Sequence, residues 1–238
     1  QQEGLERTRT LVARIDPATD VLALDDLGVG EPDSAAIQRH IAQLARDARE
    51  LPLPAIVADD PAIVIYTSGT TGFPKGVVHS QRNYVLAGEA FVARLHLQPS
   101  DRLLTLLPFF HINALFYSLG GAIAAGGTII TARNFSASRF WNLAAETRAT
   151  QFNFLAAVGT ILIKRARSEF NPAHTIRKMY GGPMTEEMLR VFRDEFHVPW
   201  MVEGYGMSEI PGASCNPFLG PHVFGSLGVP AVHPRFPG

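Results

Sequence analysis

The chain has 238 residues, of which 46% are hydrophobic and 18% are charged, and its formal net charge is -1. This composition excludes an intrinsically disordered protein, and the length allows a sizeable buried core. The charge balance leaves no basic field that would favour nucleic acid or an anionic membrane surface as a partner.

The cysteine content, the length of the apolar runs and the start of the sequence limit where the protein is expected to be located. A single cysteine, Cys215, excludes an internal disulfide framework, so a reducing cytoplasm is the expected location. No apolar run reaches about eighteen residues, so no membrane-spanning segment is expected. The start lacks both an initiator methionine and the order of a signal peptide, and we expect a piece of a longer chain. No pattern indicates an oligomeric state.

Three stretches of the chain differ in their hydrophobic pattern. Residues 1–32 are irregular, with short apolar runs between acidic residues and glycines. Residues 33–215 alternate between apolar runs of strand length and longer segments with helical spacing. Residues 216–238 are rich in glycine and proline, which predicts loops and short strands.

Within the middle stretch, helices and strands are predicted to alternate. Thr185 is the expected N-cap of the last helix, where Glu186 and Glu187 would face the positive helix end. In chain order, the helices cover residues 33–50, 80–95, 112–124, 136–147, 158–167 and 185–196, and the strands cover residues 62–66, 102–107, 128–131, 151–155, 176–180 and 198–202. This alternation predicts an α/β fold with largely parallel sheets flanked by helices on both faces.

The sharpest local signal follows the apolar strand at 62–66, where ligand loops of open α/β sheets lie. Its glycines let the backbone turn tightly and present N–H groups to an anion, while its hydroxyls donate to phosphate oxygens. Lys75 adds a positive charge on a flexible stem. The segment is Tyr66, Thr67, Ser68, Gly69, Thr70, Thr71, Gly72, Phe73, Pro74, Lys75 and Gly76.

Two other interpretations of this segment are weaker. A Walker A loop ends in Gly-Lys-Ser/Thr, whereas here Pro74 precedes Lys75 and Gly76 follows it. A solvent-exposed linker rich in Ser, Thr and Gly needs neither the preceding buried strand nor the Pro-Lys-Gly ending. We therefore predict a phosphate-binding loop of a different kind.

A second candidate loop follows the last predicted strand, at Glu203–Glu209. Tyr205 between two glycines could stack on a base, Ser208 could donate to a phosphate, and Glu209 could hold a magnesium ion, which favours carboxylate and phosphate oxygens. Alone, the pattern is more often that of a glycine turn with a surface glutamate. The segment is Glu203, Gly204, Tyr205, Gly206, Met207, Ser208 and Glu209.

Both loops resemble motifs of the adenylate-forming, or AMP-binding, superfamily. The first is similar to the signature loop that wraps the β- and γ-phosphates of ATP in that family, and the second is similar to its Tyr-Gly-x-Ser/Thr-Glu motif. The segment Pro108–Asn113 resembles the one whose aromatic or His residue, here His111, gates the acyl pocket. Tyr180–Met184 resembles the turn that packs against adenine, although it is one residue shorter than the usual form.

The resemblance to the fatty-acid or carnitine-type CoA ligase branch implies roles for particular residues. Glu209 would be the metal ligand, and Lys75, Thr67, Glu209 and His111 would be the catalytic residues. The residues implied to bind ATP are Thr67, Ser68, Gly69, Thr70, Thr71, Gly72, Lys75, Gly181, Gly182, Pro183, Glu203, Gly204, Tyr205, Gly206, Met207 and Ser208.

The implied activity is that of an acyl-CoA synthetase. A small-molecule carboxylic acid would be converted with ATP and Mg²⁺ to an acyl-adenylate, and coenzyme A would then take the acyl group. Residues 33–215 would be the nucleotide- and acyl-binding core of a partial N-terminal domain, and 216–238 would lead into a β-rich subdomain. The C-terminal domain with the family's catalytic lysine is not found in this sequence, so we expect the isolated chain to be inactive or nearly so.

Several alternatives remain at this stage. Other branches of the superfamily, such as aryl-CoA ligases and luciferase-like enzymes, share the same loops. A non-catalytic relative that binds a nucleotide or an acyl-adenylate is the main alternative outside catalysis, and a kinase is disfavoured by the non-Walker ending. The apolar residues of 152–162 suit an acyl tail, but helix packing explains them equally well. His222 and His233 stand apart in the glycine- and proline-rich tail and are predicted to be solvated loop residues.

Overall fold

The computed structural model describes residues 55–67, 73–132, 135–230 and 233. The chain divides into two compact units, residues 1–55 and 56–238. The description below concerns the second unit. The irregular start, the helix predicted at 33–50 and the boundary between 32 and 33 lie outside the described residues, and these remain predictions.

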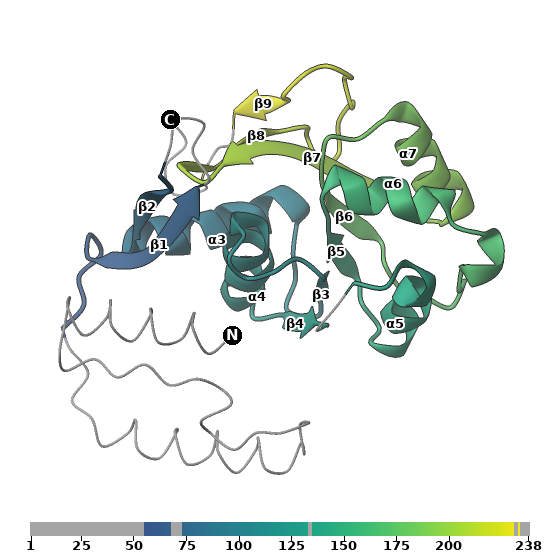
Figure 1. Ribbon diagram of the computed structural model, residues 1–238, viewed down its shortest axis with the longest axis horizontal. Coiled ribbons are helices and arrows are strands. Elements are labelled where there is room, and N and C mark those ends of the chain that lie inside the picture. The colour runs from purple at the N-terminus through teal and green to yellow at the C-terminus, as the bar shows by residue number, and fades with distance from the viewer. Residues whose placement is uncertain (1–54, 68–72, 133–134, 231–232, 234–238) are drawn as a thin grey trace, which may run out of the picture. The chain divides into compact units, whose positions relative to one another are not determined.

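A seven-stranded sheet forms the centre of the second unit, in the order β4-β3-β5-β6-β7-β8-β9 (Figure 1). The pairs among β4, β3, β5, β6 and β7 are parallel, while β7, β8 and β9 pair antiparallel. The predicted α/β fold with a largely parallel sheet is therefore confirmed. The strands are β3 (Arg102–Thr105), β4 (Thr128–Thr131), β5 (Gln151–Asn153), β6 (Lys178–Gly181), β7 (Trp200–Met207), β8 (Ile210–Cys215) and β9 (Val229–Pro230).

Helices cover both faces of this sheet (Figure 1). Ser80 caps the first, its side chain accepting a hydrogen bond from the Asn83 N–H, and Thr185 caps α7 through the Met188 N–H, as predicted. On one face lie α3 (Gln81–Leu95), the π-helical turn η2 (Asn113–Leu119) and α4 (Gly120–Ala125). On the other lie η3 (Ala137–Arg139), α5 (Phe140–Glu146), α6 (Ala156–Lys164), η4 (Arg167–Glu169), α7 (Glu186–Arg190) and the π-helical turn η5 (Val191–Glu195).

The alternation of side chains along each strand explains the two layers of helices. Leu104, Phe152 and Met179 are register partners in β3, β5 and β6, and they belong to the core beneath α5, α6 and α7. Their strand neighbours Leu103 and Tyr180 belong instead to the core beneath α3, η2 and α4. Two separate apolar layers therefore hold the strands from both sides, as a buried parallel sheet requires.

The strand predicted at 62–66 exists, but it does not join the main sheet. It forms β1 (Pro61–Thr67), which pairs antiparallel with β2 (Lys75–Ser80) in a two-stranded sheet. β2 was not predicted, because its residues follow a loop-like glycine and proline pattern. The expectation of a buried strand is also wrong, since Ile65 is the buried residue of β1 while Val64 and Tyr66 are exposed.

The last long strand also differs from the prediction. β7 does not end near Val202 but continues to Met207, because β8 turns back and pairs with it antiparallel, with Gly204 opposite Cys215. Most of the second predicted loop is therefore strand, and only Ser208 and Glu209 form the turn.

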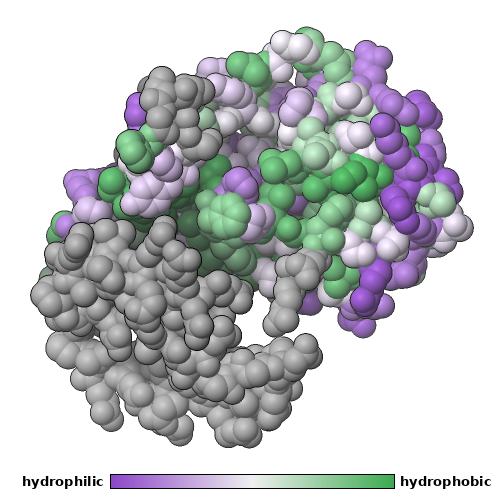
Figure 2. Space-filling model, viewed as in Figure 1, coloured by the Kyte–Doolittle hydropathy of each residue, from purple (hydrophilic) through white to green (hydrophobic). Residues whose placement is uncertain are grey.

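The helix α6 leaves part of its apolar surface exposed. Leu155 and Ile161 are each exposed by more than two fifths, at 42% and 44%. Figure 2 shows hydrophobic residues gathered over this helix. Among the described residues, none of the helices is both long enough and apolar enough to cross a membrane.

Candidate active site

A cavity of about 310 Å³ opens at the carboxyl ends of β5, β6 and β7. In open α/β sheets this edge is where ligands bind, because the loops that leave the strands diverge there. Its walls are mainly apolar and aromatic. They are formed by Ile112, Asn113, Tyr117, Phe154, Leu155, Tyr180, Gly181, Gly182, Pro183, Glu203, Gly204, Tyr205, Gly206, Ser226 and Leu227.

This cavity brings together two of the sequence segments predicted to form the site. The turn Gly181–Pro183 and the stretch Glu203–Gly206 both line it, although Glu203 is 21 positions after Gly182 in the chain. They meet because β6 and β7 are parallel neighbours, with Gly181 opposite Glu203. Phe154 and Leu155, from the predicted pocket stretch, complete the same wall.

The glycines of this edge are needed for close packing. A Cβ atom at Gly204 would lie 2.1 Å from the Tyr180 hydroxyl oxygen, and one at Gly181 would lie 2.3 Å from the Phe154 carbonyl oxygen. Any larger residue would push the cavity walls apart. A structural reason therefore exists for both glycines, alongside the ligand role predicted for them.

Glu203 holds three segments of the site together. Its Oε1 accepts a hydrogen bond from the Met184 N–H at 3.1 Å, and its Oε2 lies 2.7 Å from His222 Nε2. Its backbone N–H donates to Asn216 Oδ1 at 2.5 Å. The expectation that His222 is a solvated loop residue is therefore wrong, since its side chain is only 16% exposed and contacts this carboxylate.

His233 also differs from the prediction. Its Nε2 lies 2.9 Å from Glu89 Oε2, and its side chain is 12% exposed. Sequence reasoning placed both tail histidines in solvent because their partners are distant in the chain, and the tertiary contacts bring those partners next to them.

Two buried tyrosines form the floor of the cavity. Burial raises the pKa of Tyr117 to about 12 and raises the pKa of Tyr180 further, with the neighbouring Tyr117 adding to the second shift. Both phenols are consequently neutral at physiological pH. Arg94 lies behind them and donates through Nη2 to the Gly212 carbonyl at 2.5 Å. The floor thus presents uncharged aromatic surface to a ligand.

A buried histidine that the sequence analysis did not single out joins the two predicted ligand segments. His79 lies on β2, is 2% exposed, and its Nδ1 accepts from Asn83 Nδ2 at 2.6 Å. Its Nε2 lies 2.8 Å from the Ser208 carbonyl oxygen, which can only accept, so Nε2 carries a proton and donates to it. The hairpin that carries Lys75 is therefore bonded to the turn that carries Glu209.

The two charged groups predicted to act on a metal-bound phosphate are exposed. Lys75 begins β2, opposite Thr67, whose hydroxyl donates to the Lys75 carbonyl at 3.4 Å. Neither the Lys75 ammonium nor the Glu209 carboxylate forms an ion pair with a described residue. A free carboxylate oxygen suits Mg²⁺, and a free ammonium suits phosphate, so both groups fit the roles predicted for them. Ser68–Gly72 lie outside the described residues.

The remaining predicted site residues lie at the rim or beyond the cavity. His111 is exposed and packs against Phe110, with ring centroids 4.8 Å apart, while the next two residues enter the cavity wall. Met207 is 44% exposed and, like Ser208, lies outside the lining. Cys215 is buried, and burial raises the pKa of its thiol, which makes it a poor nucleophile.

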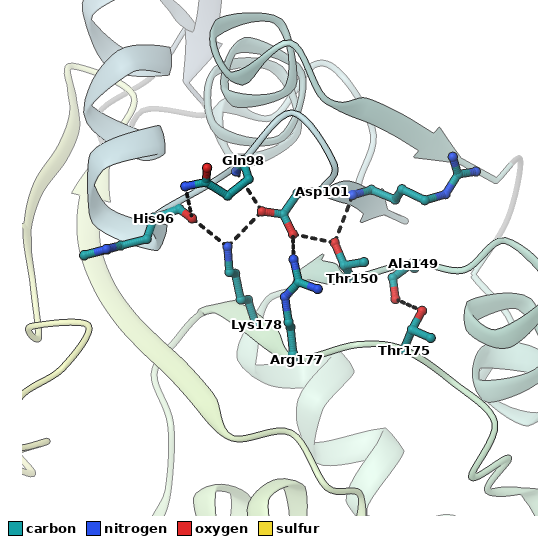
Figure 3. Close-up of polar contacts among 9 residues, drawn as sticks. His96, Gln98, Asp101, Ala149, Thr150, Thr175, Arg177 and Lys178 are labelled. Atoms are coloured by element: carbon teal, nitrogen blue, oxygen red, sulfur yellow. Dashed lines mark hydrogen bonds and ion pairs between the residues drawn. The ribbon is translucent and has the colours of Figure 1, made fainter.

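The opposite, amino-terminal edge of the sheet is closed by a charged network (Figure 3). Asp101 has no exposed side-chain surface and accepts from Lys178 Nζ at 2.8 Å, Arg177 Nη2 at 2.6 Å and Thr150 Oγ1 at 2.7 Å. Burial alone would raise the pKa of Asp101, but the hydrogen bonds from Lys178, Thr150 and the Gln98 N–H outweigh it and lower that pKa. This network therefore joins the amino ends of β3, β5 and β6, opposite the edge at which the cavity opens.

The chain has an α/β fold with a cavity at the carboxyl ends of its parallel strands, and comparison with known proteins identifies its family. The model of the family described as AMP-binding enzyme matches residues 2–236. The chain belongs to this family.

The relatives agree with that assignment. The chain is 32% identical over 214 residues to the medium/long-chain-fatty-acid–CoA ligase FadD6 of Mycobacterium tuberculosis. The matched region covers 90% of this chain and 34% of that protein. It is 35% identical over 183 residues to the sulfoacetate–CoA ligase of Cupriavidus necator, covering 76% of this chain and 36% of that protein. The chain thus spans about a third of the length of these relatives.

A solved structure shares the fold. The O-succinylbenzoate coenzyme A synthetase MenE of Bacillus subtilis, in complex with ATP and a magnesium ion, has a TM-score of 0.66 and is 26% identical. The similarity covers 76% of this chain and 38% of that protein. The predicted relation to the N-terminal domain of adenylate-forming enzymes is therefore confirmed.

Proposed function

We propose that the protein containing this chain is an acyl-CoA synthetase that activates a carboxylic acid with ATP and transfers the acyl group to coenzyme A. The observation that carries the proposal is the cavity at the carboxyl ends of β5, β6 and β7, which unites Gly181–Pro183 with Glu203–Gly206. The relatives named as CoA ligases support the same reaction class.

In the first step, the substrate carboxylate attacks the α-phosphorus of ATP, and the bond to the bridging oxygen of pyrophosphate breaks. This gives an acyl-adenylate and pyrophosphate. A carboxylate oxygen is a poor leaving group, whereas AMP is a good one, so the mixed anhydride is ready for acyl transfer. In the second step, the thiol sulfur of coenzyme A attacks the acyl carbon, AMP leaves, and the thiol proton passes to solvent or base.

Residues of this chain would act mainly through charge and position. Lys75 would bind the departing pyrophosphate as negative charge accumulates on it, and Glu209 would hold the magnesium ion. When bound, that ion supplies positive charge to phosphate oxygens. The cavity walls would orient the acid and exclude water, because the adenylate is sensitive to hydrolysis.

The family does not specify the acid. One relative is named for medium- and long-chain fatty acids and another for sulfoacetate, which differ strongly in polarity. We propose a small-molecule acid of the family's general kind, and the described cavity restricts its polarity further, as argued below.

The test is ATP–pyrophosphate exchange by the full-length protein with a panel of carboxylic acids, followed by thioester formation on addition of coenzyme A. Acid-dependent exchange together with AMP release is the expected result. ADP release or a phosphorylated product would instead indicate a phosphotransferase. Nucleotide binding with no exchange for any acid would support a non-catalytic relative.

We further propose that residues 1–238 alone give little or no exchange, because the chain spans only about a third of its relatives. The same assay on this polypeptide, beside the full-length protein, tests that point. Turnover at a comparable rate would contradict it.

A further inference from the structure

One polar side chain in the cavity wall lacks a partner. Asn113 is the first residue of η2, lines the cavity and is 8% exposed. Its side-chain oxygen is fully buried without a hydrogen-bond partner, and its amide nitrogen bonds to no described residue. Because oxygen and nitrogen of a carboxamide can be exchanged by a half-turn, the finding holds for the group as a whole. A buried carboxamide without a partner is costly, so a partner from outside the protein is expected.

The backbone of Asn113 is held in place by other buried polar groups. The Ser118 hydroxyl donates to the Asn113 carbonyl at 3.4 Å, and Asn153 Nδ2 donates to Ser118 Oγ at 2.8 Å. Gln151 in turn donates to Asn153 Oδ1. Ser118, Asn153 and Gln151 have no exposed surface. The carboxamide is therefore presented from a rigid support, as expected of a residue that selects a ligand.

The other residues of the cavity wall are mainly apolar or aromatic, in contrast to Asn113. Ile112 and Leu155 contribute hydrocarbon, and Tyr117 and Tyr180 contribute aromatic rings whose phenols are uncharged. Glu203 is the charged residue among the described lining residues, and its carboxylate is engaged by Met184 and His222. A ligand group beside Asn113 thus meets a neutral donor or acceptor within a mainly apolar and aromatic wall.

We propose that Asn113 selects acids that carry a neutral hydrogen-bonding group, such as a hydroxyl, oxo or amide group, over hydrocarbon acids of the same shape. This inference rests on the proposed function and adds the class of acid. A hydrocarbon chain in the cavity leaves the carboxamide unpaired, whereas a hydroxyl or oxo group pairs with it. A second anionic group is disfavoured, because the carboxamide carries no positive charge and Glu203 is an acid.

The experiment measures kcat/KM in ATP–pyrophosphate exchange by the full-length protein. Pairs of acids of equal length are compared, in which a hydroxyl group replaces a methyl group at successive positions, with the corresponding dicarboxylic acids as a third arm. For at least one position, the hydroxy acid should be favoured roughly ten- to a hundredfold.

Three variants test whether Asn113 is the source of that preference. Asn113→Leu keeps the volume and removes the hydrogen-bonding group, so it should reduce the ratio to about one or reverse it. Ile112→Val changes the same wall without changing its hydrogen bonds, so it should keep the wild-type ratio. Asn113→Ser provides a second substitution if Asn113→Leu does not fold, and it should give an intermediate ratio.

Three outcomes would overturn the proposal. These are a wild type without preference for the hydroxy acid at any position, a preference for the dicarboxylic acids, and an Asn113→Leu variant that loses activity equally with all acids. The last result would mean that Asn113 acts on the shared carboxylate or on folding. If no acid supports exchange, the proposed function fails, and the same acid pairs are then compared by thermal stabilisation of the wild type, where equal shifts would reject the inference separately.

Discussion

The two edges of the main sheet are built from the same strands but differ in what they hold: one has a buried ion-pair network and the other has a cavity. At the amino edge, Asp101 binds Lys178 at the start of β6 together with Arg177 and Thr150, which directly precede β6 and β5 (Figure 3). At the carboxyl edge, Gly181 and Gly204 keep the strands close while the chain diverges around about 310 Å³ of open space.

This difference shows how a parallel sheet separates stability from ligand binding. Charges at the amino edge are satisfied within the protein, so they contribute to holding β3, β5 and β6 in register. Lys75 and Glu209 are exposed and neither forms an ion pair with a described residue, so their charges remain available for the roles proposed above. Substitutions at the two edges should therefore have separable effects on activity and on stability.

The largest effect is expected at Glu209. Glu209→Gln in the full-length protein should lower the rate of adenylation by roughly a hundred- to a thousandfold, because a positioned electrostatic group is lost. Its melting temperature should match the wild type, since the side chain is exposed and unpaired among the described residues. Pyrophosphate exchange and thermal unfolding measure the two quantities. Wild-type exchange at ordinary magnesium concentration would remove Glu209 from the site.

Asp101→Asn should show the reverse pattern. It leaves Lys178 buried without its counter-charge, which should lower the free energy of unfolding by about 3 kcal/mol. Denaturant unfolding measures this loss, and the KM for ATP of the folded fraction should stay within about twofold of wild type, since the residue is at the far edge. A raised KM with unchanged stability would contradict the separation of the two edges. Asp59→Asn, at an exposed ion pair with Arg82, is a matched control and should leave the free energy of unfolding close to that of the wild type, because solvent screens the pair.

Substitution of His79, which bonds the β1–β2 hairpin to the turn that carries Glu209, should give a smaller effect. His79→Leu removes the Nε2–H bond to the Ser208 carbonyl, and we expect roughly a tenfold rise in the KM for ATP, because a single positioning bond is lost. His79→Gln can still donate at a similar reach and should recover part of that loss. A general loss of stability in both variants, with KM unchanged, would mean that His79 acts only in packing.

The smallest effect is expected when the pH is lowered. The pKa of Asp101 is below its ordinary value of 3.8, so its contribution to stability is complete above that pH and is lost as the pH falls through the lower folded-state pKa. The stability difference between wild type and Asp101→Asn should accordingly narrow below pH 3.8. A difference that stays constant to lower pH would argue against ionised Asp101 as the source of the stabilisation.

Much of the architecture was predictable because local patterns and the global fold agree. Alternating apolar strands and capped helices indicated a parallel sheet covered on both faces, and Thr185 caps its helix as expected. The segments at Gly181–Pro183 and Glu203–Gly206 were predicted to belong to one site, and they line one cavity because parallel strands end at a common edge.

Other features depended on contacts between residues far apart in the chain. The extension of β7 through Gly204 and Gly206 requires β8 as a pairing partner, and β2 requires β1, so neither strand was visible in local propensity. The roles of three residues could not be read from local sequence. His79 and His222 contact groups that are distant in the chain, and Asn113 has a buried side-chain oxygen without a partner. The sequence by itself determined the order of elements and the chemistry of the motifs, whereas tertiary structure decided which polar groups are satisfied, because hydrogen-bond partners are chosen by proximity in space.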